Sequence, residues 1–152
     1  MAAANESDDP NDASYVLVYR TCGGRIVFPG DAHDNTWKYV LSNYKELVQD
    51  CAVLIAPHHG RDSDRSFDFL DVLSPKLTLF GCARSEHLAY DAWNNRNLMH
   101  ITNNQSGNVL LNATNEEIEV YVDNWSFAQT LPAFDSTKTL HECFYIGLIP
   151  KN

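Results

Sequence analysis

The sequence predicts an α/β fold built around a mixed β-sheet. In the first part of the chain, short apolar runs of strand length alternate with helical patterns, which is typical of parallel strand-helix-strand units. The later apolar runs are separated only by polar turns, which favours antiparallel strands. With 152 residues, the chain has the length of about one domain with a core of its own.

The first two strands are predicted at residues 14–20 and 25–28, where aromatic and β-branched side chains are frequent. Gly23 and Gly24 lie between these runs and indicate a hairpin turn. Residues 1–13 are acidic, polar and rich in alanine, so we expect a flexible lead-in there. The folded domain is therefore expected to begin directly after this segment.

A helix is predicted from Asp34, because apolar and aromatic side chains recur there at steps of three and four residues. These side chains are Trp37, Val40, Leu41, Tyr44, Leu47 and Val48. Any of residues 34–36 can cap the first turn. A buried strand at residues 52–56 follows, and a second helix is expected at residues 66–73, which ends before Pro75.

The alternation continues with a strand at residues 77–80, a loop at residues 81–87 and a short helix at residues 90–95. Three later runs are predicted as antiparallel strands, because polar turns separate them. They occupy residues 99–102, 108–111 and 118–122. Residues 124–152 lack clear periodicity and are predicted as a C-terminal extension with one strand at residues 143–149.

Composition excludes several classes of protein. No apolar run approaches the roughly 18 residues of a membrane span, and the first residues do not resemble a signal peptide, so we expect a cytoplasmic protein without a membrane partner. The net charge of −9 argues against a broad nucleic-acid-binding surface. The cysteines lack the close spacings of a structural zinc site and are predicted to be reduced and mostly buried. They are Cys22, Cys51, Cys82 and Cys143.

Two short motifs contain the residues that are candidates for binding a metal ion. Gly30-Asp31-Ala32-His33 and Pro57-His58-His59-Gly60 each follow a predicted strand, and one helix lies between them. Parallel strands joined by such a crossover end on the same rim of the sheet, where ligand-binding groups gather. Because neighbouring strands lie about 4.8 Å apart, an aspartate and an imidazole there can share a metal ion. The sequence therefore predicts a metal site.

Plainer interpretations exist for the individual residues. Asp31 alone is typical of a helix cap or a turn. His33 is expected at the start of the first helix, and the alternative is a contact with the metal ligand Asp31. His100 and His141 are expected to be structural.

The ordered series of motifs resembles the C-terminal half of a metallo-β-lactamase-fold hydrolase, in particular the branch of DNA-internalisation competence proteins. In that branch a hydrophobic strand ends in Gly-Asp, a helix follows, and the next strand ends in Pro-His-His-Gly. The resemblance runs from about Asn11 to Asn112 and includes Pro75-Lys76-Leu77, Glu86-His87 and the segment at residues 101–108. It implies the C-terminal half of a metallo-β-lactamase-type αββα sandwich, with this half domain at residues 14–123.

The resemblance also implies roles for individual residues. Asp31 resembles the carboxylate that bridges two metal ions, and His59 resembles a terminal metal ligand. His58 is its neighbour and a candidate catalytic residue. His87 resembles a histidine that holds a substrate phosphate or assists a leaving group, although it could instead be a solvated loop histidine. The implied cofactors are two divalent metal ions, zinc or alternatively manganese.

The sequence departs from this family in one respect. The family's other ligands come from an earlier His-x-His-x-Asp-His motif and a further histidine, and this chain contains neither. Asp31 and His59 alone should bind zinc weakly. The first hypothesis is therefore half of a phosphodiester hydrolase, completed by an N-terminal half or by another chain.

The second hypothesis is a non-catalytic binding or scaffold module that associates with itself or with a protein partner. It follows from the half fold, because a missing half would leave one face of the sheet exposed. A third interpretation is an unrelated α/β domain in which the aspartate and the histidines serve packing.

Overall fold

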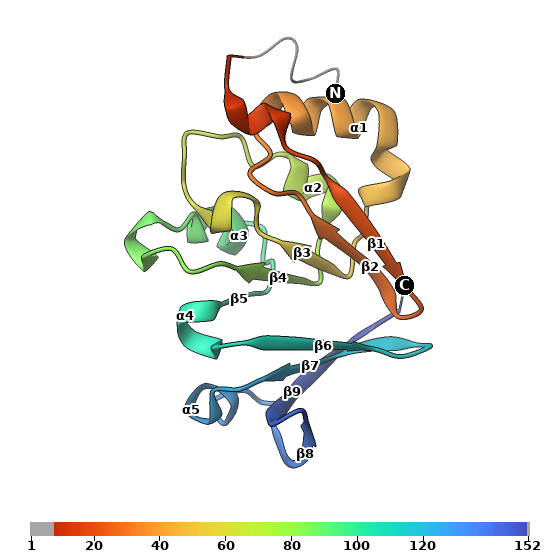
Figure 1. The fold of residues 1–152 in the computed structure, drawn as a ribbon, viewed down its shortest axis with the longest axis vertical. Helices are drawn as coiled ribbons and strands as arrows, with labels where there is room; N and C mark the ends of the chain where they lie inside the picture. The colour runs from red at the N-terminus through yellow and green to blue at the C-terminus, as the bar shows by residue number, and fades with distance from the viewer. Residues whose placement is uncertain (1–7, 152) are drawn as a thin grey trace.

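Residues 8–151 are described by a computed structural model and form two stacked β-sheets with helices on one side (Figure 1). The predicted α/β fold with a mixed sheet is confirmed: a five-stranded mixed sheet is followed by a four-stranded antiparallel sheet. Within residues 8–151, no helix has both the length and the apolar character needed to cross a membrane.

The first sheet has the strand order β1-β2-β3-β4-β5. Its strands are β1 (Leu17–Thr21), β2 (Gly24–Phe28), β3 (Val53–Ile55), β4 (Leu77–Phe80) and β5 (His100–Thr102). The predicted hairpin joins β1 and β2, and β2 to β5 run parallel. The strand predicted at residues 99–102 is present as β5, but its predicted antiparallel direction is wrong, because His100 pairs with Thr78 in parallel register. Helix α3 (Tyr90–Asn94) carries the chain back along the sheet before β5 begins, so the connection is a crossover.

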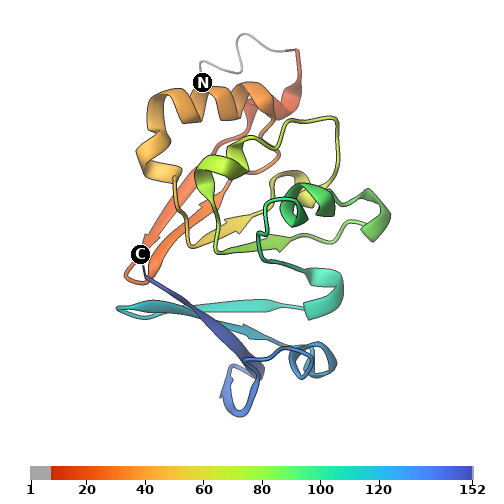
Figure 2. The same ribbon diagram turned by 180° about the vertical axis from the view of Figure 1, so that it is seen from behind.

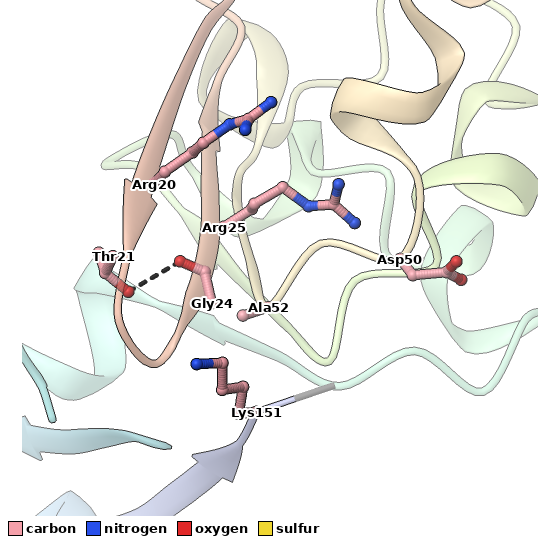
Figure 3. A pocket seen from close by; sticks show the side chains of 7 residues that line it. All are labelled: Arg20, Thr21, Gly24, Arg25, Asp50, Ala52 and Lys151. Atoms are coloured by element: carbon pink, nitrogen blue, oxygen red, sulfur yellow. Dashed lines mark hydrogen bonds between the residues drawn. The ribbon is translucent and has the colours of Figure 1, made fainter. Parts of the chain in front are cut away.

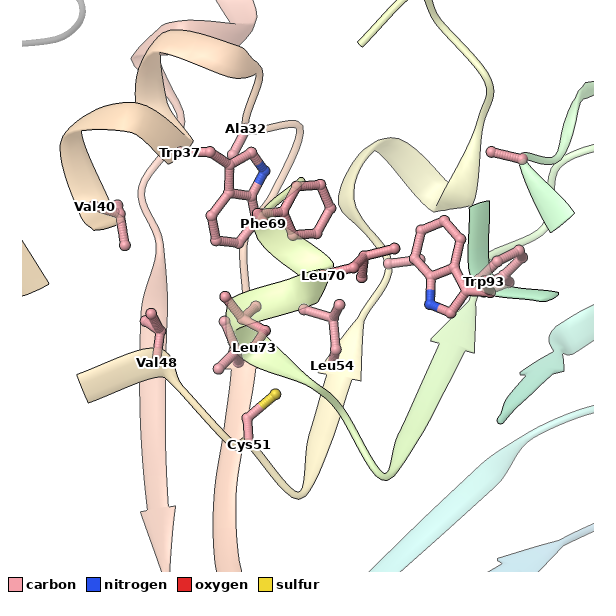
Figure 4. Close-up of a cluster of buried hydrophobic side chains, with 14 of the residues drawn as sticks. Ala32, Trp37, Val40, Val48, Cys51, Leu54, Phe69, Leu70, Leu73 and Trp93 are labelled. Atoms are coloured by element: carbon pink, nitrogen blue, oxygen red, sulfur yellow. The ribbon is translucent and has the colours of Figure 1, made fainter. Parts of the chain in front are cut away.

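Helices cover one face of this sheet, and they lie in front of it in Figure 2. They are α1 (Asp34–Val48), α2 (Phe69–Leu73) and α3. Alternate strand residues such as Val27 and Leu54 point into a buried cluster with Trp37 and Phe69, whose rings stack at 4.2 Å (Figure 4). The first predicted helix is confirmed, whereas the second begins only at Phe69.

The second sheet packs on the opposite face, where Ile26 and Val53 meet Ile118 and Ile149. Its strand order is β6-β7-β9-β8. The strands are β6 (Val109–Ala113), β7 (Glu117–Val122), β8 (Asp135–Leu140) and β9 (Cys143–Pro150), and the short helices α4 (Asn103–Ser106) and α5 (Trp125–Ala128) lie in the connections. The strand expected at residues 143–149 is thus present. Because β9 lies between β7 and β8, the boundary predicted at residue 123 falls inside one sheet.

The segment before β1 differs from the predicted lead-in. Of residues 1–13, the first seven lie outside the described residues, and the last four form a 3₁₀ turn, Pro10–Ala13. Asp12 in this turn is buried, and its carboxylate accepts a hydrogen bond from the backbone N–H of Thr36 at 3.1 Å. The start of α1 is therefore held by a preceding segment, whereas the capping predicted for residues 34–36 is wrong, because the N-cap is His33 and it makes no side-chain capping bond.

The open sheet face expected for a half sandwich is largely covered by the second sheet. Exposed apolar side chains lie at the edge of the hairpin: Tyr15, Leu17, Tyr19 and Phe28. Val16 and Val18 alternate with them and pack on the helical side. An apolar strip therefore persists at the edge strand β1.

Candidate functional site

Asp31, His58 and His59 line one pocket of about 380 Å³, and Arg61, Cys82 and Ala83 complete its lining. Asp31 follows β2, and the two histidines follow β3, so the pocket lies at the carboxyl ends of neighbouring parallel strands. The structure thus brings together the residues of the two sequence motifs. The arrangement follows from the crossover, because α1 returns the chain so that both strands end on one rim.

The histidine pair occupies an unusual backbone turn. Pro57–Gly60 is a 3₁₀ segment in which His58 and His59 both have left-handed conformations, with φ of 49° and 60°. The His58 N–H donates to the Gly30 carbonyl at 3.0 Å, and the Gly81 N–H donates to the His59 carbonyl at 3.2 Å. Non-glycine residues rarely adopt this conformation, and such strain is often found at functional sites.

The His59 ring lies directly against the backbone of Gly81. A Cβ atom at residue 81 would be 2.8 Å from His59 Nδ1 and 3.0 Å from His59 Cβ. Glycine is therefore needed at this position if the ring is to keep its place in the pocket.

His58 is held by a buried arginine that sequence reasoning missed. Arg65 Nη2 lies 3.1 Å from His58 Nδ1, and the Ser63 hydroxyl lies 3.4 Å from the same nitrogen. Burial lowers the pKa of His58, the nearby cation of Arg65 acts in the same direction, and Asp31 opposes them. No sequence pattern marks Arg65, because burial of a loop arginine depends on segments distant in the chain.

Asp31 and His59 differ from His58 in their bonding. Neither side chain forms a hydrogen bond with another residue among 8–151, so their oxygen and nitrogen atoms are available to a ligand in the pocket. Across the same residues, no three histidine, cysteine or acidic side chains form a group that could hold a metal ion.

The other histidines lie outside the pocket lining. The His87 side chain is 53% exposed and lies 3.5 Å from a carboxylate oxygen of Glu86. His33 stands at the N-cap of α1, as predicted. His100 stacks on Phe80 with ring centroids 5.1 Å apart, and His141 lies in the exposed turn before β9. Of the two predicted catalytic histidines, only His58 therefore faces the same pocket as Asp31.

The prediction that the cysteines are mostly buried is only half right, because Cys22 and Cys82 are exposed and Cys51 and Cys143 are buried. All four are free thiols, and Cys82 lines the candidate pocket. Loop position explains the exposure: Cys22 lies in the hairpin turn and Cys82 follows β4.

Cys51 is expected to resist alkylation in the folded protein, because burial raises the pKa of its thiol to about 12 and the thiolate is the reactive form. At pH 8 iodoacetamide should modify Cys82 at least about a hundredfold faster than Cys51, as measured by peptide mass spectrometry. In guanidinium chloride both should react at similar rates. Equal rates in the folded protein would contradict the buried position of Cys51.

Two further pockets are lined by side chains that are less suited to binding a metal ion or to catalysis. A mostly apolar pocket of about 530 Å³ lies between the sheets, with Met99, Ile101 and Phe127 among its lining residues. A pocket of about 260 Å³ at the opposite end of β2 is lined by Arg20, Arg25 and Lys151 (Figure 3). The Arg25 guanidinium donates to two backbone carbonyls at the end of α1, so Arg25 has a structural role.

The described residues form an α/β protein whose pocket of acidic and imidazole groups lies at the ends of parallel strands. No model of a known protein family matches the chain. Comparison with curated proteins likewise finds no match. The functional argument therefore depends on the fold and the pocket.

Proposed function

We propose that this chain is the C-terminal half of a metal-dependent hydrolase of the metallo-β-lactamase type, acting on phosphodiesters. Another segment or chain would complete its site. The observation that carries the proposal is the shared pocket of Asp31, His58 and His59 at the carboxyl ends of β2 and β3. The left-handed turn at the histidine pair supports it, because such backbone strain is often found at functional sites.

The layer order also supports the proposal. Helices, a mixed sheet and a second sheet are stacked in the described residues, which corresponds to an α-β-β arrangement. An αββα sandwich has one more helical layer, outside the second sheet. In this proposal, the completing segment supplies that layer together with the remaining metal ligands.

The donor atoms of the pocket fit divalent zinc or manganese. A carboxylate and an imidazole are ordinary ligands for both metals. The side chains of Asp31 and His59 form no hydrogen bond within residues 8–151, so their donor atoms remain available. With only two ligands from this chain, neither of the two metal ions has a complete set of protein ligands. The proposal therefore requires ligands from elsewhere.

When bound, two divalent ions supply an activated water and positive charge that stabilises the reacting phosphodiester. Asp31 binds through its carboxylate and His59 through a ring nitrogen. Arg61, which is exposed on the pocket wall, attracts the anionic substrate. His87 lies outside the pocket lining and would contact only a substrate that extends beyond the pocket.

A binding or scaffold module is the second candidate function. The apolar strip of Tyr15, Leu17, Tyr19 and Phe28 lies along the edge strand β1, and an exposed edge of this kind favours association with another chain. In this role the chain would pair with itself or with a protein partner, without catalysis.

Metal titration tests the proposal. Calorimetry with Zn²⁺ and with Mn²⁺ should show weak binding to the wild-type chain, and Asp31→Asn and His59→Gln should each weaken it at least about tenfold, because each removes a direct ligand. His141→Gln is the matched control, since His141 lies in an exposed turn far from the pocket lining.

Equal binding by the wild type and both pocket variants would contradict the hydrolase proposal. Loss of binding in His141→Gln alone would contradict it as well. If the chain binds neither metal and has the native mass of an oligomer, the scaffold role is favoured instead.

A further inference from the structure

Arg65 is a charged side chain placed in the interior directly beside the histidine pair. It is only 6% exposed, and all three of its guanidinium nitrogens have partners. Nε lies 3.1 Å from the Ser63 hydroxyl, Nη1 lies 2.6 Å from the Ala32 carbonyl oxygen, and Nη2 lies 3.1 Å from His58 Nδ1. This geometry fixes the guanidinium against His58.

The contact determines which nitrogen of His58 carries the proton. A guanidinium has only donors, so the ring nitrogen that it contacts must be an acceptor. His58 Nδ1 is then unprotonated, and the neutral imidazole carries its hydrogen on Nε2. Histidines that bind metals usually show a different arrangement, in which the second ring nitrogen donates to a carboxylate or carbonyl.

We propose that Arg65 is a positioning residue that fixes His58 as an Nε2–H donor, and that His58 thereby binds an anionic oxygen of the ligand. The two adjacent histidines then have separate roles: the ring nitrogens of His59 form no hydrogen bond within residues 8–151 and are available to a metal, and His58 donates a hydrogen bond. The oxygen is identified as phosphoryl only through the proposed function. The assignment of the tautomer is independent of it.

The charges around the pocket agree with an anionic ligand. Arg61 lines the pocket and Arg65 lies beside His58, whereas Asp31 is the only acidic side chain among the described residues that line the pocket. The carboxylates of Asp34, Asp31, Asp9 and Asp12 act on Arg65 and partly offset its charge. An anionic oxygen near His58 therefore meets a hydrogen-bond donor, with the guanidinium of Arg61 in the same pocket.

Nitrogen NMR of the wild-type chain tests the tautomer directly. At pH 8, a long-range ¹H–¹⁵N spectrum should show His58 entirely in the Nε2-protonated form. His100 is an internal contrast, because its Nδ1 lies 3.3 Å from the Leu98 carbonyl oxygen, which can only accept, so it should be Nδ1-protonated. A proton on His58 Nδ1 overturns the proposal.

The variant Arg65→Met tests the role of the arginine. It should convert His58 into a mixture of tautomers while His100 stays unchanged, and Arg65→Lys should restore part of the single form. Arg96→Met removes the same charge from a surface pair with Asp71 and should leave His58 unchanged. An unchanged His58 spectrum in folded Arg65→Met overturns the positioning role.

Titration with inorganic phosphate tests the ligand class. Phosphate should shift the His58 Nε2–H signal, and Arg65→Met should bind phosphate about tenfold more weakly, the effect of roughly one charge-assisted hydrogen bond. If Arg65→Met does not fold, the wild-type titration decides alone. A phosphate response that leaves His58 unaffected overturns the anion-binding role.

Zn²⁺ separates this inference from the proposed function. Failure of the chain to bind Zn²⁺ contradicts the hydrolase proposal but leaves the tautomer result intact. Coordination of Zn²⁺ through His58 Nε2, seen as loss of its proton, overturns the inference even if the chain is a metal-dependent hydrolase.

Discussion

Replacing Trp93 with alanine is expected to lower the free energy of unfolding by about 3–5 kcal/mol, because the side chain is completely buried. Its ring meets Phe80 edge-on at 4.7 Å, and its indole N–H donates to the Thr78 hydroxyl at 2.8 Å. The substitution leaves a cavity in the helical layer and an unpaired hydroxyl in a buried strand, which adds about 1 kcal/mol or more.

Urea unfolding followed by circular dichroism measures this loss. Trp125→Ala is the matched control, because Trp125 is 44% exposed and contacts Phe134 and Phe144 only from one side. Trp125→Ala should lower the free energy of unfolding much less than Trp93→Ala does. Similar losses for the two variants would show that the cluster in Figure 4 is not the main core.

Replacing Gly60 with alanine is expected to destabilise the protein by about 2–5 kcal/mol in total, from backbone strain and from overpacking. Gly60 has a φ of +84°, and a Cβ atom there would approach the Phe80 ring to 2.9 Å. Phe80 is buried, so it cannot move away without disturbing its neighbours. The substitution should also displace the adjacent histidines and change the pocket.

Gly30→Ala separates the two contributions, because Gly30 also has a positive φ of +57° but its nearest contacts would be an ordinary 3.6 Å. It should cost only about 1–2 kcal/mol, the strain alone. Thermal unfolding of both variants, with His58 and His59 observed by NMR, provides the comparison. If Gly60→Ala costs no more than Gly30→Ala, the close contact with Phe80 is not a constraint.

Local patterns in the sequence predicted the elements whose structure depends on near neighbours. The helix from Asp34 was predictable because apolar side chains recur along it, although Tyr44 and Leu47 of that pattern are exposed and Tyr44 interrupts the helix. The shared rim of Asp31 and His59 was predictable because parallel strands end on one edge. The direction of β5 was not recognised, although the helix predicted at residues 90–95 lies before this strand and serves as its crossover.

Features that depend on distant segments escaped prediction. Arg65 is buried only because the residue 32 carbonyl and His58 approach it from other parts of the chain. The exposure of Cys82 follows from its place after β4, and a single cysteine carries no pattern that reveals this. The strand β9 was expected, but not its insertion between β7 and β8, because strand order within a sheet is not encoded locally.

The left-handed turn at His58 and His59 has a consequence for the way the protein opens. Left to itself, this segment would relax to an ordinary conformation, so its shape is maintained by the Gly30 and Gly81 backbones on either side. The turn cannot keep its conformation once the strands that anchor it have opened. In native-state hydrogen exchange, the amides of the turn should therefore open no later than β2 and β4, and the pocket should be among the first parts lost.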